Sequence, residues 1–323
     1  MSDNGYAYAV ARVRAKELAL LGAQAVEQLM AAKSAADCVR ILAEKGWGTG
    51  DANQSAEALL AGERDKTWAL LLELTDDMSV FDVFLLANDY HNLKVSIKLV
   101  YTDQQPNGVF IPHGTVEPQQ ILDAVKGHDY AALPADMRAA AEEAHLAITH
   151  TGDGQLCDIL VDRAALSAIL AAGKASSFAL IQGYAELVVA VADIKTAARC
   201  QKTGKGLDFM KKALCPCDSL DTDSLAHAAA SGFEPLLQYL DTTDYKEAAE
   251  ALRVSTSRFE RYADNAVMEL IRPQKYHSFT IEPLAAYLLA RENELRVVRM
   301  ILSGKVNKLS EQSVRERLRE MYV

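Results

Sequence analysis

The segment Thr203-Gly-Lys-Gly206 contains the residue types of a phosphate-binding loop. Such a loop needs a glycine five residues before its second glycine, and a serine or threonine directly after its lysine. Arg199 occupies the first of these positions and Gly206 the second. We therefore interpret the segment as a turn that ends a helix, and we expect no nucleotide site here.

The cysteines and histidines could in principle bind a metal ion or act in catalysis. Cys215-Pro-Cys217 lies downstream of Cys200, but zinc sites use cysteine pairs separated by two to four residues and need four ligands. No second pair follows, and His91 has no serine or cysteine nucleophile in a recognisable motif. The sequence therefore predicts no catalytic residue, no metal site and no cofactor, and the cysteines are interpreted as apolar thiols around a proline turn.

Three polar triplets recur at a constant spacing of 101 residues: Asn92-Leu93-Lys94, Asp193-Ile194-Lys195 and Glu294-Leu295-Arg296. Each has a polar or acidic residue, an aliphatic residue and a basic residue. One interpretation is that the triplets make equivalent packing contacts within each fold unit. The other is that they face a binding partner. We favour the first, because equal placement suits a role that every unit shares.

The elements that would position these triplets have helical periodicity. Apolar residues follow steps of three and four in three segments, 86–100, 180–198 and 284–302, so each predicts a helix with one buried face. The repeat of about 100 residues predicts three related helical domains. Chance alignment of helical heptads is the alternative explanation of the spacing.

Prolines and glycines predict where the helices and domains end. All eight prolines lie after position 105, so the first 105 residues are expected to form long helices. We expect helix breaks at Gly22, at 46–50 and at 76–77. Composition changes place linkers near 105 and 215. The sequence therefore predicts an all-α fold with helical domains at 1–105, 106–215 and 216–323.

Composition and charge restrict the class of protein. The chain has 323 residues and a net charge of -10, which disfavours nucleic-acid binding. Residues 253–323 carry 13 basic and 9 acidic residues. This basic end is either a docking face or a chance variation in surface charge. Five widely spaced cysteines favour a reducing cytoplasm, and no apolar run reaches the ~18 residues of a membrane-spanning helix.

Several segments resemble one protein family, the C subunits of archaeal and bacterial V/A-type ATPases, whose eukaryotic counterpart is the d subunit of the vacuolar ATPase. The start Tyr-Ala-Tyr-Ala-Val-Ala-Arg-Val-Arg at 6–14 is similar to the start of that family. The stretch Asp-Tyr-His-Asn-Leu-Lys at 89–94 resembles its first-domain signature. The last-domain signature resembles Glu-Asn-Glu-Leu-Arg-Val-Val-Arg-Met-Ile-Leu at 292–302, together with Gly-Lys-Val-Asn-Lys-Leu at 304–309. The closing residues 315–323 also fit.

The resemblance implies three similar helical domains in a pseudo-threefold arrangement that forms a funnel without an enzymatic centre. The funnel would connect the soluble central-stalk rotor subunits to the membrane proteolipid ring and pass torque between them, on the cytoplasmic face of the membrane. We expect a non-catalytic, peripheral subunit that is monomeric in isolation. The structural or interface candidates are Tyr6, Arg12, Asp89, Asn92, Lys94, Asp193, Lys195, Glu294, Arg296 and Arg299.

One alternative belongs to a different class of protein. A helical-repeat scaffold would bind peptides or proteins in a concave groove. Scaffolds of this kind have repeats of about 33–47 residues, whereas the only period found in this sequence is near 101. The spacing therefore disfavours the scaffold.

Overall fold

The computed structural model of the chain describes residues 5–48 and 54–323, and these residues contain helices but no β-strand. The predicted all-α class is therefore confirmed. The α-helices are α1 (Ala7–Glu17), α2 (Ala23–Ala31), α3 (Ala35–Glu44), α4 (Ala56–Leu74), α5 (Asp82–Tyr101), α6 (Pro118–Gly127), α7 (Ala135–Thr151), α8 (Gly154–Ala175), α9 (Ala179–Lys202), α10 (Leu207–Ala213), α11 (Thr222–Ser231), α12 (Phe233–Asp241), α13 (Lys246–Val254), α14 (Thr256–Ile271), α15 (Glu282–Val306) and α16 (Glu311–Arg315). Short 3-10 helices lie at Ser79–Phe81, Tyr130–Ala132 and Arg272–Tyr276.

Side-chain caps and glycines determine where many of these helices begin and end. Ser55 caps α4 by accepting a hydrogen bond from the Ala58 amide, and Asp153 caps α8 in the same way. The breaks expected at Gly22 and at 76–77 are confirmed, because α1 ends at Glu17 and α4 ends at Leu74. The break expected at 46–50 begins after α3 as predicted, but its second part lies outside the described residues.

The chain divides into two compact units, and the first unit is discontinuous in sequence. It contains Met1–Met78 together with Glu250–Val323, whereas Ser79–Ala249 form the second unit. The two ends of the chain therefore fold into one core. The three-domain funnel and the boundaries near 105 and 215 stay predictions.

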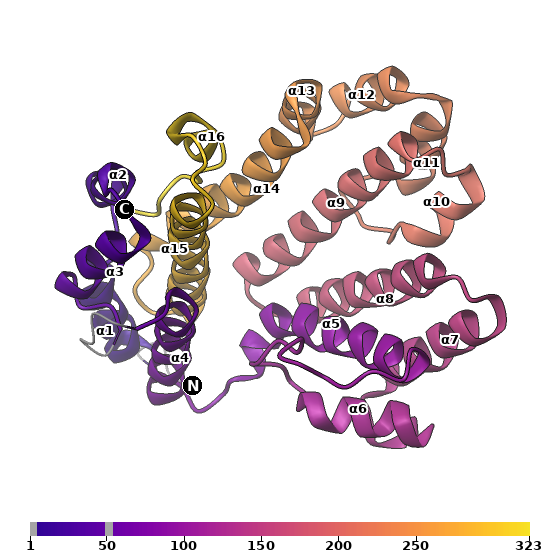
Figure 1. Cartoon of the computed structure of the whole chain (residues 1–323), viewed down its shortest axis with the longest axis horizontal. Helices are drawn as coiled ribbons and strands as arrows, with labels where there is room; N and C mark the ends of the chain where they lie inside the picture. The colour runs from indigo at the N-terminus through magenta and orange to yellow at the C-terminus, as the bar shows by residue number, and fades with distance from the viewer. Residues whose placement is uncertain (1–4, 49–53) are drawn as a thin grey trace. The chain divides into compact units, whose positions relative to one another are not determined.

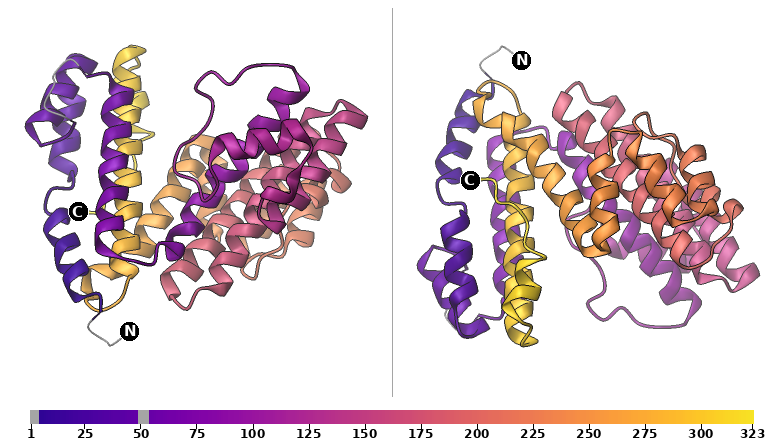
Figure 2. Two further views of the ribbon diagram at one scale, coloured as in Figure 1. Left: turned by 90° about the horizontal axis from the view of Figure 1, so that it is seen from below. Right: turned by 90° about the horizontal axis from the view of Figure 1, so that it is seen from above.

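In the first unit, α15 is the central helix. Most of its 25 residues are buried, including Leu284, Leu288 and Leu302 of the predicted apolar stripe. It packs against α1, α3, α4 and α14, and it lies alongside α4 over much of its length (Figures 1 and 2). Because α1–α4 come from the start of the chain, this core joins residues more than 200 positions apart.

In the second unit, α9, α8, α5 and α6 form successive layers, and α7 packs on α5 and α8 (Figure 1). The core contains Leu93 and Ile97 of the predicted stripe on α5. Close approach of α8 and α9 requires a glycine, since a Cβ atom at Gly173 would lie 2.3 Å from the Cβ of Ala185. This layered packing holds α5 and α9, which carry two of the three polar triplets.

Candidate functional site

The first residue of each polar triplet is completely or almost completely buried and binds the backbone of a non-helical segment. Asn92 exchanges two hydrogen bonds with the backbone of Ile111, each 2.8 Å long. Asp193 Oδ1 accepts a bond of 3.0 Å from the Cys215 amide. Glu294 Oε1 accepts a bond from the Leu21 amide. By the predicted boundaries, the Asp193 contact lies within one domain, whereas the contacts of Asn92 and Glu294 cross from one domain to another.

Burial changes the protonation chemistry of these carboxylates. Desolvation raises the pKa of Asp193 to about 7, although the Cys215 amide and the charge of Arg163 lower it. Asp193 Oδ2 is buried and has no hydrogen-bond partner. Desolvation also raises the pKa of Glu294, against the opposing charge of Arg291. Both groups are costly to bury when they are charged.

Asp89 forms hydrogen bonds that hold the segment after α5 against that helix. Its two carboxylate oxygens accept bonds from the Thr115 amide (3.0 Å), the Thr115 hydroxyl (2.7 Å) and the Val116 amide (3.2 Å). Gly114 leaves room for the carboxylate, because a Cβ atom there would lie 2.1 Å from Asp89 Oδ1. Asp89 and Asn92 together therefore hold residues 111–116, which spacing alone did not predict.

The basic residues of the triplets lie closer to the surface. Lys94 forms a 2.6 Å ion pair with Asp162 on α8, and Arg296 pairs with Asp264 on α14. Lys195 is exposed on α9. If the predicted repeats are correct, Asp162 comes from the repeat after that of Lys94, whereas Asp264 comes from the same repeat as Arg296. The two pairs are therefore similar in chemistry but differ in connectivity.

The remaining candidates lie on α1 and α15. Arg12 forms a 2.8 Å ion pair with Glu73 on α4 and a 2.7 Å bond to the hydroxyl of Tyr8. Tyr6 is half-buried at the start of α1, and its carbonyl accepts the Val10 amide. Arg299 is exposed on α15. Of these three, only Arg12 also lines a pocket of the first unit, which is described below.

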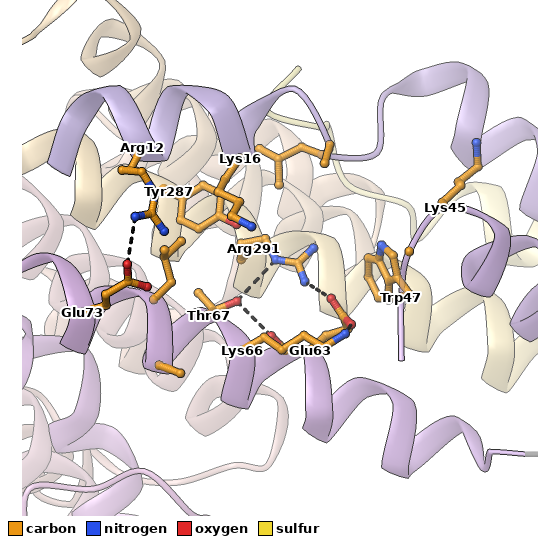
Figure 3. A pocket seen from close by; sticks show the side chains of 15 residues that line it. Arg12, Lys16, Lys45, Trp47, Glu63, Lys66, Thr67, Glu73, Tyr287 and Arg291 are labelled. Atoms are coloured by element: carbon orange, nitrogen blue, oxygen red, sulfur yellow. Dashed lines mark hydrogen bonds and ion pairs between the residues drawn. The ribbon is translucent and has the colours of Figure 1, made fainter. Parts of the chain in front are cut away.

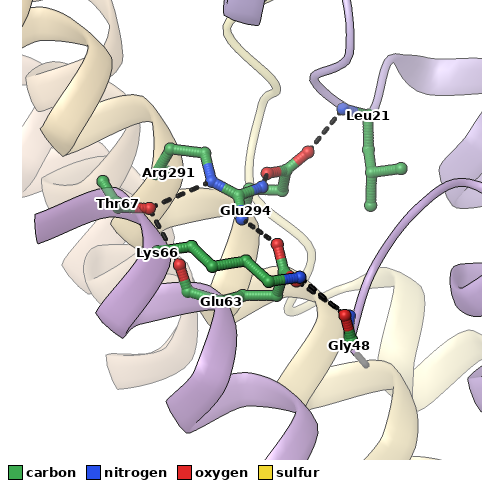
Figure 4. Close-up of polar contacts among 7 residues, drawn as sticks. All are labelled: Leu21, Gly48, Glu63, Lys66, Thr67, Arg291 and Glu294. Carbon is green, nitrogen blue, oxygen red and sulfur yellow. Dashed lines mark hydrogen bonds and ion pairs between the residues drawn. The ribbon is translucent and has the colours of Figure 1, made fainter. Parts of the chain in front are cut away.

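The first unit also contains a buried ionic network built on Arg291, which spacing and motifs did not indicate (Figure 4). Arg291 donates to Glu63 Oε2 over 2.6 Å and also to Glu294 Oε2. Glu63 Oε1 accepts bonds from the Gly48 amide (2.8 Å) and from Lys66 Nζ (2.7 Å). The carboxylates of Glu63 and Glu294 thus balance the charges of Arg291 and Lys66. The same two carboxylates also accept hydrogen bonds from the backbone amides of Gly48 and Leu21, which lie in connecting segments.

A pocket of about 410 Å³ opens beside this network in the first unit (Figure 3). Its wall is formed by residues of α1, α4 and α15 and by the turn that follows α3. The charged residues lining it are five cations and two carboxylates: Arg12, Lys16, Lys45, Lys66, Arg291, Glu63 and Glu73. Positive charge is therefore in excess in a chain whose net charge is -10.

The carboxylates of the pocket are already engaged by cations. Glu73 binds Arg12, and Glu63 binds Lys66 and Arg291. Lys16 and Lys45, by contrast, are exposed, and their ammonium groups form no hydrogen bond or ion pair with any residue in the described part of the chain. Figure 3 shows Lys16 beside Tyr287 and Lys45 at the end of the pocket near Trp47. An incoming anionic group would meet these two ammonium groups first.

The phosphate-loop segment and the Cys215-Pro-Cys217 motif lie between helices, whereas His91 lies on α5. Gly204 has a φ of 67° and follows the last residues of α9, so Thr203–Gly206 is a turn that ends a helix. Cys215 is buried in the segment that Asp193 binds. Among residues 5–48 and 54–323, no three histidine, cysteine or acidic side chains lie together as metal ligands. Within the same residues, no helix has both the length and the apolar character needed to cross a membrane.

The described residues form an all-helical protein whose buried polar side chains bind its own backbone. The chain belongs to the ATP synthase (C/AC39) subunit family, whose family model matches residues 9–317. It is 24% identical to the C subunit of the V-type sodium ATPase of Enterococcus hirae, over 96% of this chain and 97% of the relative.

Two archaeal relatives are similar over most of their length. The C subunit of the A-type ATP synthase of Desulfurococcus sp. is 22% identical, covering 96% of this chain and 90% of the relative. That of Thermococcus kodakarensis is 22% identical, covering 92% and 86%. The predicted resemblance to the C subunits of V/A-type ATPases is therefore confirmed.

Proposed function

We propose that this chain is the non-catalytic rotor subunit that connects the soluble central stalk of a V/A-type rotary ATPase to its membrane proteolipid ring. It transmits torque and thereby couples ATP turnover to the transport of protons or sodium ions. The observation that carries the proposal is the family match over residues 9–317, together with relatives named as C subunits that align along nearly their whole length.

The polar core supports a mechanical role. The network around Arg291 ties α15 to α4, and Glu294 ties α15 to the segment between α1 and α2. Hydrogen-bonded networks of this kind resist rearrangement, because breaking one contact leaves a buried charge unpaired. A subunit that passes torque needs this resistance, so the buried residues serve the function by holding helices together.

The location and partners follow from the same proposal. The chain binds as a peripheral subunit on the cytoplasmic face of the membrane complex, and its partners are other rotor subunits and the proteolipid ring. The names of the relatives include both a sodium ATPase and ATP synthases, so the transported ion and the direction of the reaction stay open. The scaffold alternative has no comparison in its favour.

Removing the chain tests this function directly. In the proposed complex, ATP is hydrolysed in the soluble head and ions cross in the membrane ring. Membranes that lack the chain should therefore lose ATP-driven ion pumping, measured by fluorescence quenching in vesicles, while the released head still hydrolyses ATP. Adding the purified chain back should restore pumping. Intact, coupled pumping in a complex shown to lack the chain contradicts the proposal.

A further inference from the structure

We propose that the cationic pocket of the first unit is a docking site for an acidic segment of a partner subunit. The site consists of Lys16 and Lys45, with Arg12 and Lys66 beside them. The partner is a protein segment that carries two or more carboxylates. This inference rests on the proposed function, since that function requires the chain to bind neighbouring subunits.

The charge of the pocket selects the chemistry of the partner. Each carboxylate in the pocket already has a cation, so the surplus charge belongs to Lys16 and Lys45. Two ammonium groups in a concave surface attract carboxylates and raise the rate of encounter with an acidic partner. Carboxylates of an incoming acidic segment would form ion pairs with both lysines.

The surroundings favour a protein segment over a free phosphate. Phosphate sites commonly present several free backbone amides at one point. Here the nearby amides of Gly48 and Leu21 are already bound by Glu63 and Glu294. The anion would therefore meet side chains alone, as carboxylates do in salt bridges between proteins.

An exposed tyrosine beside the pocket gives a second indication. Tyr8 is 67% exposed and lies one turn before Arg12 on α1, so it extends the row of Arg12 and Lys16 along that helix. Protein interfaces are enriched in tyrosine and arginine, whereas a small anion gains nothing from an exposed aromatic ring.

The floor of the pocket is preorganised. Arg291 lies with its guanidinium 4.9 Å from the centre of the Trp47 ring and is held by Glu63 and Glu294. Lys66 is held in turn by Glu63 and by the Gly48 carbonyl, at 2.7 Å each. Little ordering is left for the partner to impose on these groups, which favours binding.

The test uses membranes from cells that lack the chain, with the purified full-length chain added back. The K16E/K45E variant reverses both lysines. Both are exposed, so the fold should be retained and circular dichroism can check it. The matched control is K33E/K126E, which changes the net charge equally at exposed lysines outside the pocket. Bound chain and restored pumping are measured separately over a range of protein and salt concentrations.

We expect K16E/K45E to need about tenfold more protein than wild type for half-maximal binding at low salt. The difference should shrink as salt screens the charges, and K33E/K126E should bind like wild type. Equal binding of K16E/K45E and wild type would overturn the site. So would displacement of the wild-type chain by millimolar inorganic phosphate at constant ionic strength, since the pocket would then be a small-anion site.

Two further outcomes are also decisive. If light scattering shows that the wild-type chain forms dimers that K16E/K45E abolishes, a second copy is the occupant and the proposal is wrong. If the wild-type chain binds the membranes without restoring pumping, the connector function is wrong. The amounts of bound wild type and bound K16E/K45E still show whether the pocket is a docking site. The two proposals are thereby tested apart.

Discussion

At the scale of single residues, Arg291 determines whether the polar core of the first unit is stable. It is 6% exposed and neutralises two buried carboxylates, Glu63 and Glu294. Desolvation raises the pKa of Glu294 and the charge of Arg291 opposes that shift, so the carboxylate depends on its partner to stay ionised. The arginine is thus more important for stability than any exposed pair on the same helix.

We expect the R291A variant to lose about 3–5 kcal/mol of unfolding free energy, because removing one partner leaves buried charge uncompensated. Urea denaturation followed by circular dichroism measures the loss. R296A is the matched control on α15, since the ion pair of Arg296 with Asp264 is exposed and worth about 0–1 kcal/mol. Equal stability of R291A and R296A would contradict the role assigned to the network.

The titration of Asp193 predicts how stability changes with pH. The folded pKa is about 7, above an unfolded value of about 3.9, so the folded state binds the extra proton between these values. Stability should therefore be highest below pH ~4 for this group and fall as the pH rises through about 7, by about 2–4 kcal/mol. Asp89 and Glu294 have raised pKa values for the same reason and add to the slope.

The D193N variant carries a neutral side chain that resembles the protonated acid. It should therefore remove the contribution of Asp193 to the change of unfolding free energy with pH. We expect it to be more stable than wild type at pH 8 by about 2–4 kcal/mol and similar near pH 4. Urea denaturation across this pH range checks the difference. The D76N variant changes an exposed aspartate and should follow the wild-type profile. A D193N profile parallel to wild type would show that Asp193 is ionised throughout.

At the scale of elements, side chains of α5 form hydrogen bonds to the backbone of the segment that follows this helix. Asn88 donates to the His113 carbonyl over 2.9 Å, Asn92 binds Ile111, and Asp89 binds Thr115 and Val116. A segment with Pro106 and Pro112 is poorly suited to a helix or a sheet ladder, so its backbone depends on side chains for hydrogen bonds. Helix α5 supplies them from one face.

We expect the N92L variant to loosen the backbone around Ile111, since the Ile111 amide and carbonyl would lose their partners, while Asn88 and Asp89 still hold residues 113–116. The loss should be about 1–3 kcal/mol, and hydrogen exchange around Ile111 should become faster while α8 and α9 stay protected. His91 makes only an exposed 3.4 Å contact to the Val109 carbonyl, so H91A serves as the control. Unchanged exchange at Ile111 in N92L would contradict the assignment.

At the scale of the whole molecule, the first unit joins both ends of the chain. Helices α1–α4 pack with α14–α16, and Arg315 of α16 forms an ion pair of 2.6 Å with Glu27 of α2. Residues far apart in sequence therefore share one cooperative core, whereas residues 79–249 have a core of their own.

This division predicts the pattern of local unfolding. In R291A, hydrogen exchange should accelerate together in α1–α4 and in α14–α15, because these helices share the disturbed core. Exchange in α5, α8 and α9 should change far less. Mass spectrometry of peptides from both units measures the pattern. Uniform acceleration along the chain would show that the two units unfold as one.

The sequence by itself determined the helical class and the helix breaks at Gly22 and at 76–77. Periodicity, prolines and caps act locally, so they can be recognised in a short window. The spacing of 101 residues also drew attention to Asn92, Asp193 and Glu294, and the structure shows that all three are buried.

Only the tertiary structure decided which residues these groups meet. Glu63 and Arg291 are 228 positions apart and look like ordinary surface charges in their own helices. Nothing local indicates that α4 packs on α15, because contact between distant segments depends on how the whole chain buries its apolar faces. The ionic network and the cationic pocket exist only after that packing, so they could not be predicted from the sequence.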